Sequence, residues 1–359
     1  MDRALFSPFT LRGMTTRNRI WVPPMCQYSS EGRDGMPAAW HLVHLGSLAK
    51  GGVGAIILEA TAVVPEGRIS PEDLGLWNDA QRDALAPIVS FLHDQGAAAG
   101  IQLAHAGRKA STYRAWGETR RGSVPLAEGG WPTAAPSAVA FEGLETPREL
   151  DVDGIQAIVA AFAAAARRAV DAGFDMVEIH AAHGYLLHEF LSPLSNRRTD
   201  AYGGSLENRA RIVLETVEAV RAEIGPGVAL LVRFSATDWT PGGWTPQETE
   251  QVVRWVAERG ADMIDVSTGG NVATATIPAG PGYQVPFAAA IRAATGVPTA
   301  AVGMIDQAYQ AEQVLITGQA DVVLVGREMM RDPHFALRAA RQLGVELDYA
   351  PGPYARAFA

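Results

Sequence analysis

The chain has 359 residues, of which 48% are hydrophobic and 19% are charged, and its formal net charge is −9. This composition excludes a disordered chain, which combines low hydrophobicity with high net charge. The excess of acidic residues also argues against a nucleic-acid partner and against an anionic membrane surface, because phosphate groups are bound by basic surfaces.

Cys26 is the single cysteine. One thiol excludes an internal disulfide and any cysteine-rich zinc or iron–sulfur site, and it fits a reducing compartment. Residues 1–9 contain no apolar segment of the kind found in secretion signals. The longest apolar run, residues 157–166, is far shorter than the roughly 20 residues that span a bilayer. We therefore expect a cytoplasmic protein with no membrane partner.

Eight short apolar runs rich in valine and isoleucine predict β-strands. Most of them are apolar on both faces, which is typical of a parallel sheet covered by helices. The expected strands cover residues 19–25, 54–60, 98–104, 174–180, 228–234, 262–267, 298–303 and 321–326.

A longer segment with helical patterning follows each strand. The expected helices cover residues 40–50, 79–95, 151–172, 206–223, 246–259, 286–294, 306–317 and 333–343. Several have explicit end signals. Residues 245–248 (Thr-Pro-Gln-Glu) form a capping box with proline at the first helical position, and Gly173, Gly260, Gly318 and Gly344 stand where left-handed C-terminal caps belong.

Eight strand–helix units without a break in composition predict a single domain over residues 1–359, folded as a (β/α)₈ TIM barrel. The alternative is a doubly wound open sheet, but no Gly-x-Gly-x-x-Gly turn follows the first strand. We expect residues 1–18 to form a hairpin across the bottom of the barrel. Residues 105–150 are expected to form a long loop over its C-terminal face, and residues 344–359 a tail.

The first strand leads into Pro23-Pro24-Met25-Cys26-Gln27-Tyr28 at the end of the barrel where such folds place their chemistry. Cys26 and Tyr28 share strand parity, so we expect both side chains to face the mouth of the barrel. The alternative for Cys26 is a small buried hydrophobe, the more common role of a lone cysteine.

The fourth strand ends in the most informative segment, residues 178–185 (Glu-Ile-His-Ala-Ala-His-Gly-Tyr). His180 and His183 can converge on one atom, either to bind a metal or to donate hydrogen bonds to an oxyanion. A metal needs further ligands from other strand ends, and these are lacking. We therefore expect no metal, and we favour hydrogen bonds to a carbonyl oxygen with Tyr185 as the proton source.

Two polar residues interrupt apolar strands. Gln102 is either a ligand contact or a member of a core network. Arg233 is costly to bury without a partner, so it belongs either to a buried ion pair or beside an anionic cofactor. Lys109, just after the third strand, is either a surface cation or a site residue.

Gly303, Gly326 and Arg327 end the last two strands, where phosphate sites recur in this fold. Glycine lets the backbone approach a phosphate, and arginine supplies a planar fork of donors. Together these residues predict a cofactor that carries a phosphate group.

These motifs resemble the Old Yellow Enzyme family of FMN-dependent ene-reductases, in particular its bacterial, xenobiotic-reductase-like branch. The resemblance spans essentially the whole chain. It is carried by residues 18–19 (Asn-Arg), 24–28 (Pro-Met-Cys-Gln-Tyr), 40–41 (Trp-His), 59–61 (Glu-Ala-Thr), 102–109 (Gln-Leu-Ala-His-Ala-Gly-Arg-Lys), 180–186 (His-Ala-Ala-His-Gly-Tyr-Leu), 195–205 (Ser-Asn-Arg-Arg-Thr-Asp-Ala-Tyr-Gly-Gly-Ser), Arg209 and 326–327 (Gly-Arg).

The resemblance implies tightly bound, non-covalent FMN. In such a site Gln102 hydrogen-bonds the pyrimidine edge, Arg233 lies by N1 and O2, and the phosphate is held near Arg327. The full set of residues expected to bind FMN is Pro23, Pro24, Met25, Cys26, Ala60, Gln102, His180, Arg233, Gly303, Gly326 and Arg327.

The resemblance also implies catalytic roles. Tyr28, His180 and His183 bind the carbonyl oxygen of an enone or a phenol, Tyr185 is the proton donor, and Cys26 tunes the potential of the flavin. NADPH or NADH delivers hydride to FMN and leaves, and the enone then enters the same pocket in a ping-pong mechanism. Nitro compounds and quinones are further expected acceptors.

Two positions depart from relatives. Val302 stands where close relatives can carry tryptophan, so a wider pocket is expected. Arg356 and Phe358 in the tail are candidates for entering a neighbouring subunit's site in a homodimer or homotetramer. The alternative is a frayed terminus.

The residues alone leave two other functions open. One is a metal-dependent barrel hydrolase that uses His180 and His183. The other is a flavin-binding redox sensor that acts through Cys26 without turnover.

Overall fold

A closed barrel of eight parallel strands forms the centre of the molecule in the computed structural model, which describes residues 3–358. The strands are β3 (Ile20–Val22), β4 (Ala55–Ala62), β5 (Ala98–Ala104), β8 (Met176–Ala181), β9 (Ala229–Ser235), β10 (Met263–Ser267), β11 (Thr299–Ala301) and β12 (Val322–Leu324). They pair in that order, and β12 closes the barrel against β3. The predicted (β/α)₈ barrel is confirmed, and the open sheet is wrong.

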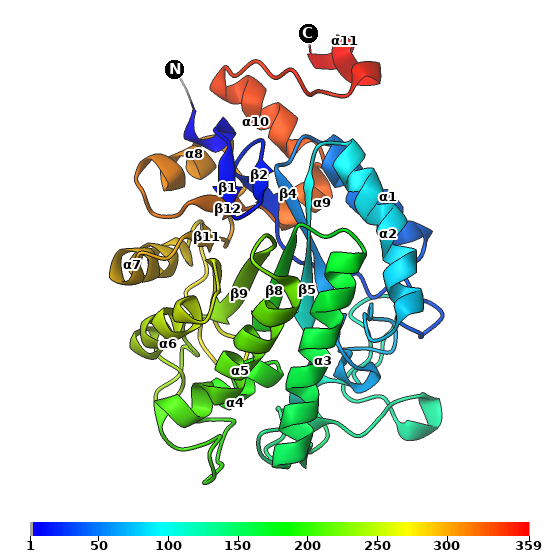
Figure 1. The fold of residues 1–359 in the computed structure, drawn as a ribbon, viewed down its shortest axis with the longest axis vertical. Helices are drawn as coiled ribbons and strands as arrows, with labels where there is room; N and C mark the ends of the chain where they lie inside the picture. Colours follow the sequence, from blue (N-terminus) through cyan, green and yellow to red (C-terminus); the bar gives the residue numbers. More distant parts are fainter. Residues whose placement is uncertain (1–2, 359) are drawn as a thin grey trace.

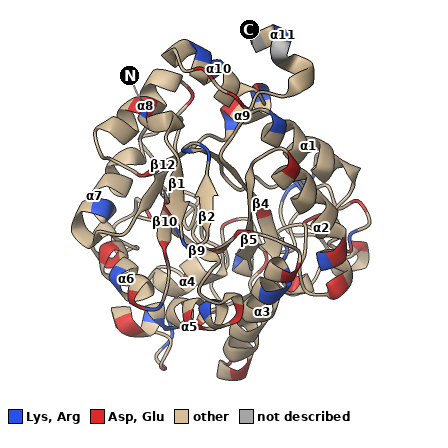
Figure 2. Cartoon of the chain, turned by 45° about the horizontal axis from the view of Figure 1, so that its top comes forward, with Lys and Arg blue, Asp and Glu red and all other residues tan. Residues whose placement is uncertain are grey.

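Helices surround this barrel (Figures 1 and 2), and charged residues of both signs occur mostly in the helices and loops (Figure 2). The helices are α1 (Ala39–Lys50), α2 (Asp79–Asp94), α3 (Val152–Asp171), α4 (Leu186–Leu191), α5 (Leu206–Ile224), α6 (Pro246–Glu258), α7 (Val285–Thr295), α8 (Ala308–Ile316), α9 (Arg327–Arg331), α10 (Phe335–Leu343) and α11 (Ala355–Phe358). The capping box of Thr245 and Glu248 opens α6, and Gly344 ends α10 with a φ of 69°.

Alternation along the strands separates two sets of side chains. The outward set, such as Ile101, Val177 and Val232, joins the large apolar core beneath the helices. The inward set begins at the N-terminal end with apolar residues that include Trp21 and Leu231. Toward the C-terminal end the same inward positions become polar, and all of these residues are buried: Gln102, Glu178, His180, Arg233, Ser235, Asp265 and Ser267.

An antiparallel hairpin of β1 (Phe9–Leu11) and β2 (Met14–Thr16) covers the N-terminal end of the barrel. Leu11 and Met14 pack against the apolar inward set. The Gly13 amide donates to the carbonyl of Gly227 at 3.0 Å. A Cβ atom at Gly13 would lie only 2.9 Å from that oxygen, so the close approach requires glycine.

Several elements differ from the expected ones. Strand β3 ends at Val22 because Pro23 and Pro24 have no amide hydrogen for the ladder. Strand β11 ends before Gly303, whose φ of 125° is incompatible with a regular strand. Helices α4 and α9, and the short pair β6 (Ala134–Ala135) and β7 (Arg148–Glu149) inside the loop over residues 105–150, were not expected.

The tail packs against the barrel of its own chain. The side-chain amide of Asn18 donates to the Tyr349 hydroxyl at 3.1 Å, and the Lys50 ammonium donates to the Tyr354 hydroxyl at 2.8 Å. Both chain ends lie at the top of Figure 1. Arg356 is exposed. The other tail candidate, the side chain of Phe358, lies outside the described part.

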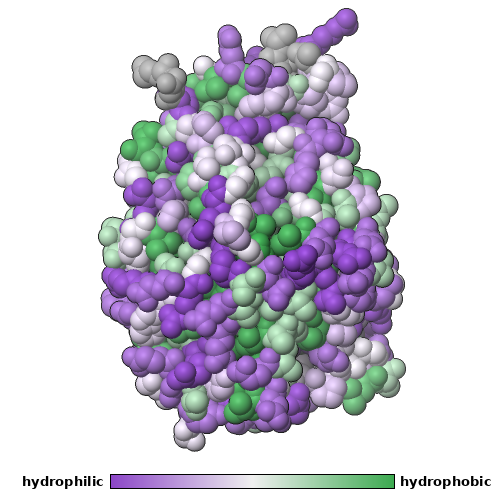
Figure 3. All heavy atoms as spheres, viewed as in Figure 1, coloured by the Kyte–Doolittle hydropathy of each residue, from purple (hydrophilic) through white to green (hydrophobic). Residues whose placement is uncertain are grey.

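The face of the molecule in Figure 3 is mostly polar. Hydrophilic residues dominate the face in Figure 3, with small hydrophobic patches between them. Within residues 3–358, no helix has the length and apolar character needed to cross a membrane.

Truncation of a core side chain on α3 should destabilise the barrel. Phe162 is 0% exposed, so Phe162→Ala should lower the free energy of unfolding by about 3–5 kcal/mol through lost contacts and a residual cavity. Urea denaturation followed by circular dichroism measures the change. Val152→Ala, at a position 48% exposed on the same helix, should cost less than about 1 kcal/mol. Equal effects of the two substitutions would contradict this packing.

Candidate active site

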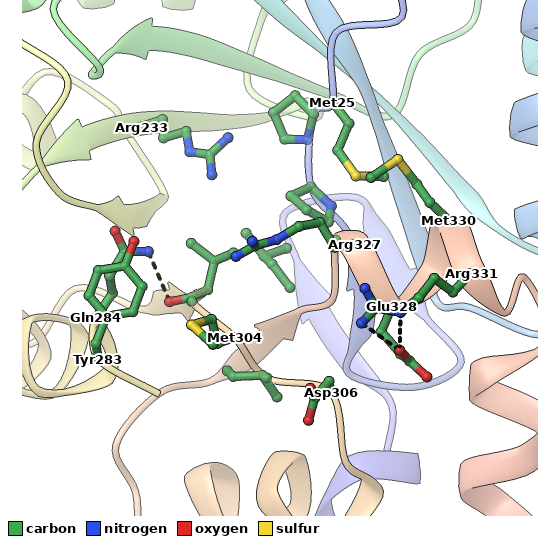
Figure 4. Close-up of a pocket in the computed structure, with 17 residues that line it drawn as sticks. Met25, Arg233, Tyr283, Gln284, Met304, Asp306, Arg327, Glu328, Met330 and Arg331 are labelled. Carbon is green, nitrogen blue, oxygen red and sulfur yellow. Dashed lines mark hydrogen bonds and ion pairs between the residues drawn. The ribbon is translucent and has the colours of Figure 1, made fainter. Parts of the chain in front are cut away.

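A cavity of about 370 Å³ opens at the C-terminal ends of strands β3, β9, β11 and β12 (Figure 4), within the size range of small-molecule sites. Seven of the residues predicted to bind a cofactor line it: Pro23, Pro24, Met25, Arg233, Gly303, Gly326 and Arg327. Val302 lines it as well. Four other predicted residues, Cys26, Ala60, Gln102 and His180, do not line this cavity.

Arg233 points into the cavity from β9, with its terminal nitrogens toward the centre (Figure 4). Its Nε lies 3.0 Å from Oδ2 of the buried Asp265. Arg233 therefore forms the buried ion pair that was one of its two expected roles. It also lines the cavity, and its contact with a cofactor stays a prediction. The terminal nitrogens face the cavity, where they can donate to a ligand.

The cavity is also lined by the cation Arg327 and by the backbone of Gly303. Arg327 reaches into it (Figure 4) and has no ion pair within residues 3–358, whereas its neighbour Arg331 lies 2.8 Å from Glu328. A Cβ atom at Gly303 would lie 3.1 Å from the Gln284 side chain, and side chains rarely adopt its φ of 125°, so this position favours glycine. These features suit a phosphate group.

A second group of residues gathers beside the cavity. Cys26, Tyr28 and Tyr185 pack against a small apolar cluster that contains Ala60 and Ile69. The parity argument for Cys26 and Tyr28 is wrong, because the chain leaves the strand at Pro23 and Tyr28 has a left-handed φ of 52°. The irregular backbone, rather than strand alternation, brings the two side chains together.

Burial keeps these groups protonated. The pKa of the Cys26 thiol is raised well above its usual value, chiefly by burial and then by the nearby Asp73 and Glu59 carboxyls. Burial likewise raises the pKa values of Tyr28 and Tyr185. At neutral pH this part of the site therefore holds a thiol and two phenols, with no thiolate.

The two histidines lie together at the end of β8. Their ring centroids are 5.1 Å apart with the planes at 87°, and the Tyr185 ring lies 5.1 Å from that of His180 at 82°. His180 is the direct register partner of Arg233 on β9. The histidine pair therefore adjoins the wall of the cavity.

Both imidazoles are neutral. Burial, followed by the charge of Arg233, holds the pKa values of His180 and His183 well below their usual range. The Ala182 amide donates to His180 Nδ1 at 3.3 Å, so the ring hydrogen of His180 is on Nε2. His183 Nε2 lies 2.7 Å from the Ser267 hydroxyl oxygen.

Lys109 is a half-buried cation with acceptors inside the protein rather than a freely exposed surface lysine. Its ammonium donates to the carbonyls of His183 at 2.8 Å and Gly270 at 3.0 Å. These carbonyls belong to tightly packed turns, since His183 has a φ of 60° and a Cβ on Gly184 would lie 2.4 Å from the Gly270 oxygen. Lys109 thus links the loops after β5, β8 and β10 through hydrogen bonds.

Sequence reasoning missed several buried carboxyls. Glu178 accepts a hydrogen bond from Gln102 Nε2 at 2.7 Å, so Gln102 belongs to a core network. Asp265 pairs with Arg233, and Asp73 lines a small cavity with Tyr185. The signal for Glu178 and Asp265 was present, because each interrupts an apolar strand. Asp73 lies in a loop and had no such signal.

The metal alternative finds no support in the geometry. Among residues 3–358 there is no group of three or more His, Cys, Asp or Glu side chains arranged to hold a metal ion. The Nε2 atom of His183 is also hydrogen-bonded to the Ser267 hydroxyl.

Comparisons with known proteins agree with this geometry. Residues 4–346 match the model of the NADH:flavin oxidoreductase / NADH oxidase family. The chain is 48% identical over 357 residues to an NADPH dehydrogenase of Geobacillus thermodenitrificans, and 48% identical over 355 residues to one of Listeria monocytogenes. Each match covers 99% of both chains.

Two solved structures are similar over nearly the whole chain. Morphinone reductase is 30% identical, with a TM-score of 0.78, and the match covers 97% of this chain and 91% of that one. The old yellow enzyme homologue from Zymomonas mobilis is 28% identical, with a TM-score of 0.79, and the match covers 96% and 94%.

The barrel and its site define a flavin-dependent oxidoreductase. The chain belongs to the NADH:flavin oxidoreductase / NADH oxidase family, and its resemblance to Old Yellow Enzymes is confirmed. Its cofactor is FMN and its hydride donor is a nicotinamide. The cavity fits FMN, because Arg233 offers donors to a polar ring and Arg327 offers a charge to a phosphate.

Removal of the Arg327 charge should weaken FMN binding. A charge-assisted hydrogen bond contributes about 1.5–3 kcal/mol, so Arg327→Ala should raise the Kd for FMN by roughly 10- to 100-fold. Fluorescence titration of the apoprotein with FMN measures this. Arg331→Ala is the matched control, because Arg331 lines the same cavity but is paired with Glu328. Equal effects of the two would remove Arg327 from the phosphate site.

Proposed function

We propose that the protein takes hydride from NADPH and uses it to reduce the activated C=C bond of α,β-unsaturated carbonyl compounds, in two half-reactions that share one pocket. The observation that carries this proposal is the pair of neutral imidazoles with Tyr28, Tyr185 and Cys26, next to the cavity that Arg233 faces. Bound FMN supplies the hydride chemistry.

The histidines hold the carbonyl oxygen of the substrate. His180 donates from Nε2, the nitrogen that the Ala182 amide leaves protonated. In the structure the Ser267 hydroxyl donates to Gln284 Oε1 at 3.2 Å, and His183 can donate from Nδ1 once this hydroxyl rotates to donate to His183 Nε2. Negative charge grows on this oxygen as hydride reaches the β-carbon. Each oriented donor there is worth about 10²-fold or more in rate.

Tyr185 supplies the proton for the α-carbon. Its ring packs edge-on against His180, and burial keeps its hydroxyl protonated at working pH. Tyr28 lies across the same apolar cluster and contacts the substrate. Cys26 tunes the potential of the flavin as a neutral thiol. Burial raises the pKa of this thiol and so opposes the thiolate that a redox sensor would need.

The shape of the molecule suggests further properties. Val302 is a small side chain on the cavity wall, which leaves room for bulkier acceptors such as quinones and nitro compounds. The tail is bound to its own barrel through Tyr349 and Tyr354, and Arg356 is exposed beyond them. We propose that the protein forms a homodimer or homotetramer in which Arg356 reaches a neighbouring subunit. We also propose that it is located in the cytoplasm.

Anaerobic titration tests the reaction. The visible spectrum of the purified yellow protein should bleach with NADPH and recover when 2-cyclohexenone is added. Bleaching without recovery would show that cyclic enones are not oxidants of this enzyme. Recovery should be about 100-fold slower in His183→Ala because one oxyanion donor is lost. His93→Ala, on the far end of α2, should recover at the wild-type rate. An unchanged rate in flavin-loaded His183→Ala would overturn the role of His183.

The pH dependence of kcat/KM should reflect the titration of Lys109 rather than that of the histidines. Burial lowers the pKa of Lys109 to about 8, while both imidazoles stay neutral. The protonated ammonium lies 4.9 Å from the Tyr185 ring centroid and favours negative charge on the substrate. We expect kcat/KM for 2-cyclohexenone to fall as pH rises through about 8, because the cation is then lost.

Lys109→Met should abolish the fall in kcat/KM near pH 8 and leave a lower kcat/KM that does not change with pH. Glu189 and Asp73 also have pKa values raised to about 8 by burial. A fall that persists in Lys109→Met would be assigned to one of those carboxyls.

A further inference from the structure

Two carboxyl groups inside the barrel have no part in the proposed mechanism. Glu178 on β8 and Asp265 on β10 are both 0% exposed. Strand β9 lies between them and carries Arg233. Two buried carboxylates against one guanidinium would leave one negative charge without compensation in the interior, at a cost of several kcal/mol.

The hydrogen bonds of this group show how the charge is balanced. Asp265 Oδ2 lies 3.0 Å from Arg233 Nε, and Glu178 Oε1 accepts from the neutral amide of Gln102 at 2.7 Å. The Asp265 carboxyl raises the pKa of Glu178, and Glu178 lowers the pKa of Asp265, so the two carboxyls act on each other. Apart from the ion pair, Glu178 Oε2 and both Asp265 oxygens have no hydrogen-bond partner in the described part of the chain.

Two carboxyl groups can hydrogen-bond to each other only if one of them carries a proton. Asp265 faces the cation, whereas Glu178 faces an amide, so the proton belongs on Glu178. Burial raises the pKa values of both carboxyls, and the Arg233 charge opposes this rise. The resulting charges are +1 on Arg233, −1 on Asp265 and 0 on Glu178, and they sum to zero.

We propose that Glu178 and Asp265 share one proton, and that this proton keeps the buried group of Arg233, Asp265 and Glu178 electrically neutral beneath the FMN ring. The inference rests on the proposed position of the ring beside Arg233. An additional negative charge on the two carboxyls would oppose the addition of electrons to FMN. The pair is therefore a positioning and tuning element that acts through Arg233.

Infrared spectroscopy tests the proton without FMN. The wild-type apoprotein should show the C=O band of a buried carboxylic acid that is absent in Glu178→Gln. The band should also be lost in Asp265→Asn, although Glu178 is retained, because Glu178 then ionises to neutralise Arg233. Difference spectra separate this band from those of other buried carboxyls such as Glu189. A wild-type spectrum without this band, or its persistence in Asp265→Asn, would overturn the shared proton.

The reduction potential tests the link to FMN. At the wild-type midpoint potential, the ratio of reduced to oxidised FMN should change by less than threefold in either single variant, because each keeps the group neutral. It should rise by at least tenfold, about 30 mV for a two-electron couple, in the Glu178→Gln/Asp265→Asn double variant, which leaves Arg233 unpaired. Glu189→Gln, the control at another buried carboxyl, should stay within threefold.

Two ionised carboxylates predict a different result. Each single substitution would then remove one negative charge and raise the ratio on its own, which would overturn the proposal. A double variant with an unchanged ratio would overturn the tuning of FMN. The infrared result is independent of turnover, so failure to reduce enones would contradict the proposed function and leave the shared proton supported.

Discussion

Every side chain that points into the closed barrel must find its partners inside it, since no solvent reaches that surface from the side. At the N-terminal end the requirement is met by apolar packing around Trp21, under the β1–β2 hairpin. Toward the C-terminal end the inward positions are polar: Gln102 donates to Glu178, and Arg233 forms an ion pair with Asp265. This polar layer holds Arg233 at the wall of the cavity, so the proposed charge balance adjoins the proposed cofactor site.

The chemistry of the site relies on hydrogen bonding more than on ionised groups. Burial leaves two neutral imidazoles, two phenols and a thiol around the place proposed for the substrate. Neutral donors can stabilise a growing oxyanion through oriented hydrogen bonds. Positive charge is supplied from the edges, by Arg233 on the cavity side and by Lys109 behind Tyr185.

Much of the fold could be predicted from local signals. Apolar runs, capping residues such as Thr245 and the glycines after helices are properties of neighbouring residues, and they located most strands and helices within a few positions. The histidine pair and the glycines at the strand ends could be placed for the same reason. Partners across strands could not, because the ion pair of Arg233 with Asp265 depends on the register between β9 and β10. Lys109 was undecided because its acceptors, the carbonyls of His183 and Gly270, are distant in sequence.

The fastening of three loops by Lys109 has a consequence for altering this enzyme. The Phe141 ring, in the long loop after β5, lies 4.8 Å from the Lys109 ammonium, which in turn holds the turns at His183 and Gly270. Substitutions in contact with a shared partner are not additive. Changes at Phe141 and at the turn after β10 will therefore show epistasis with changes at His183. Libraries that vary these loops one at a time will miss combinations that only work together.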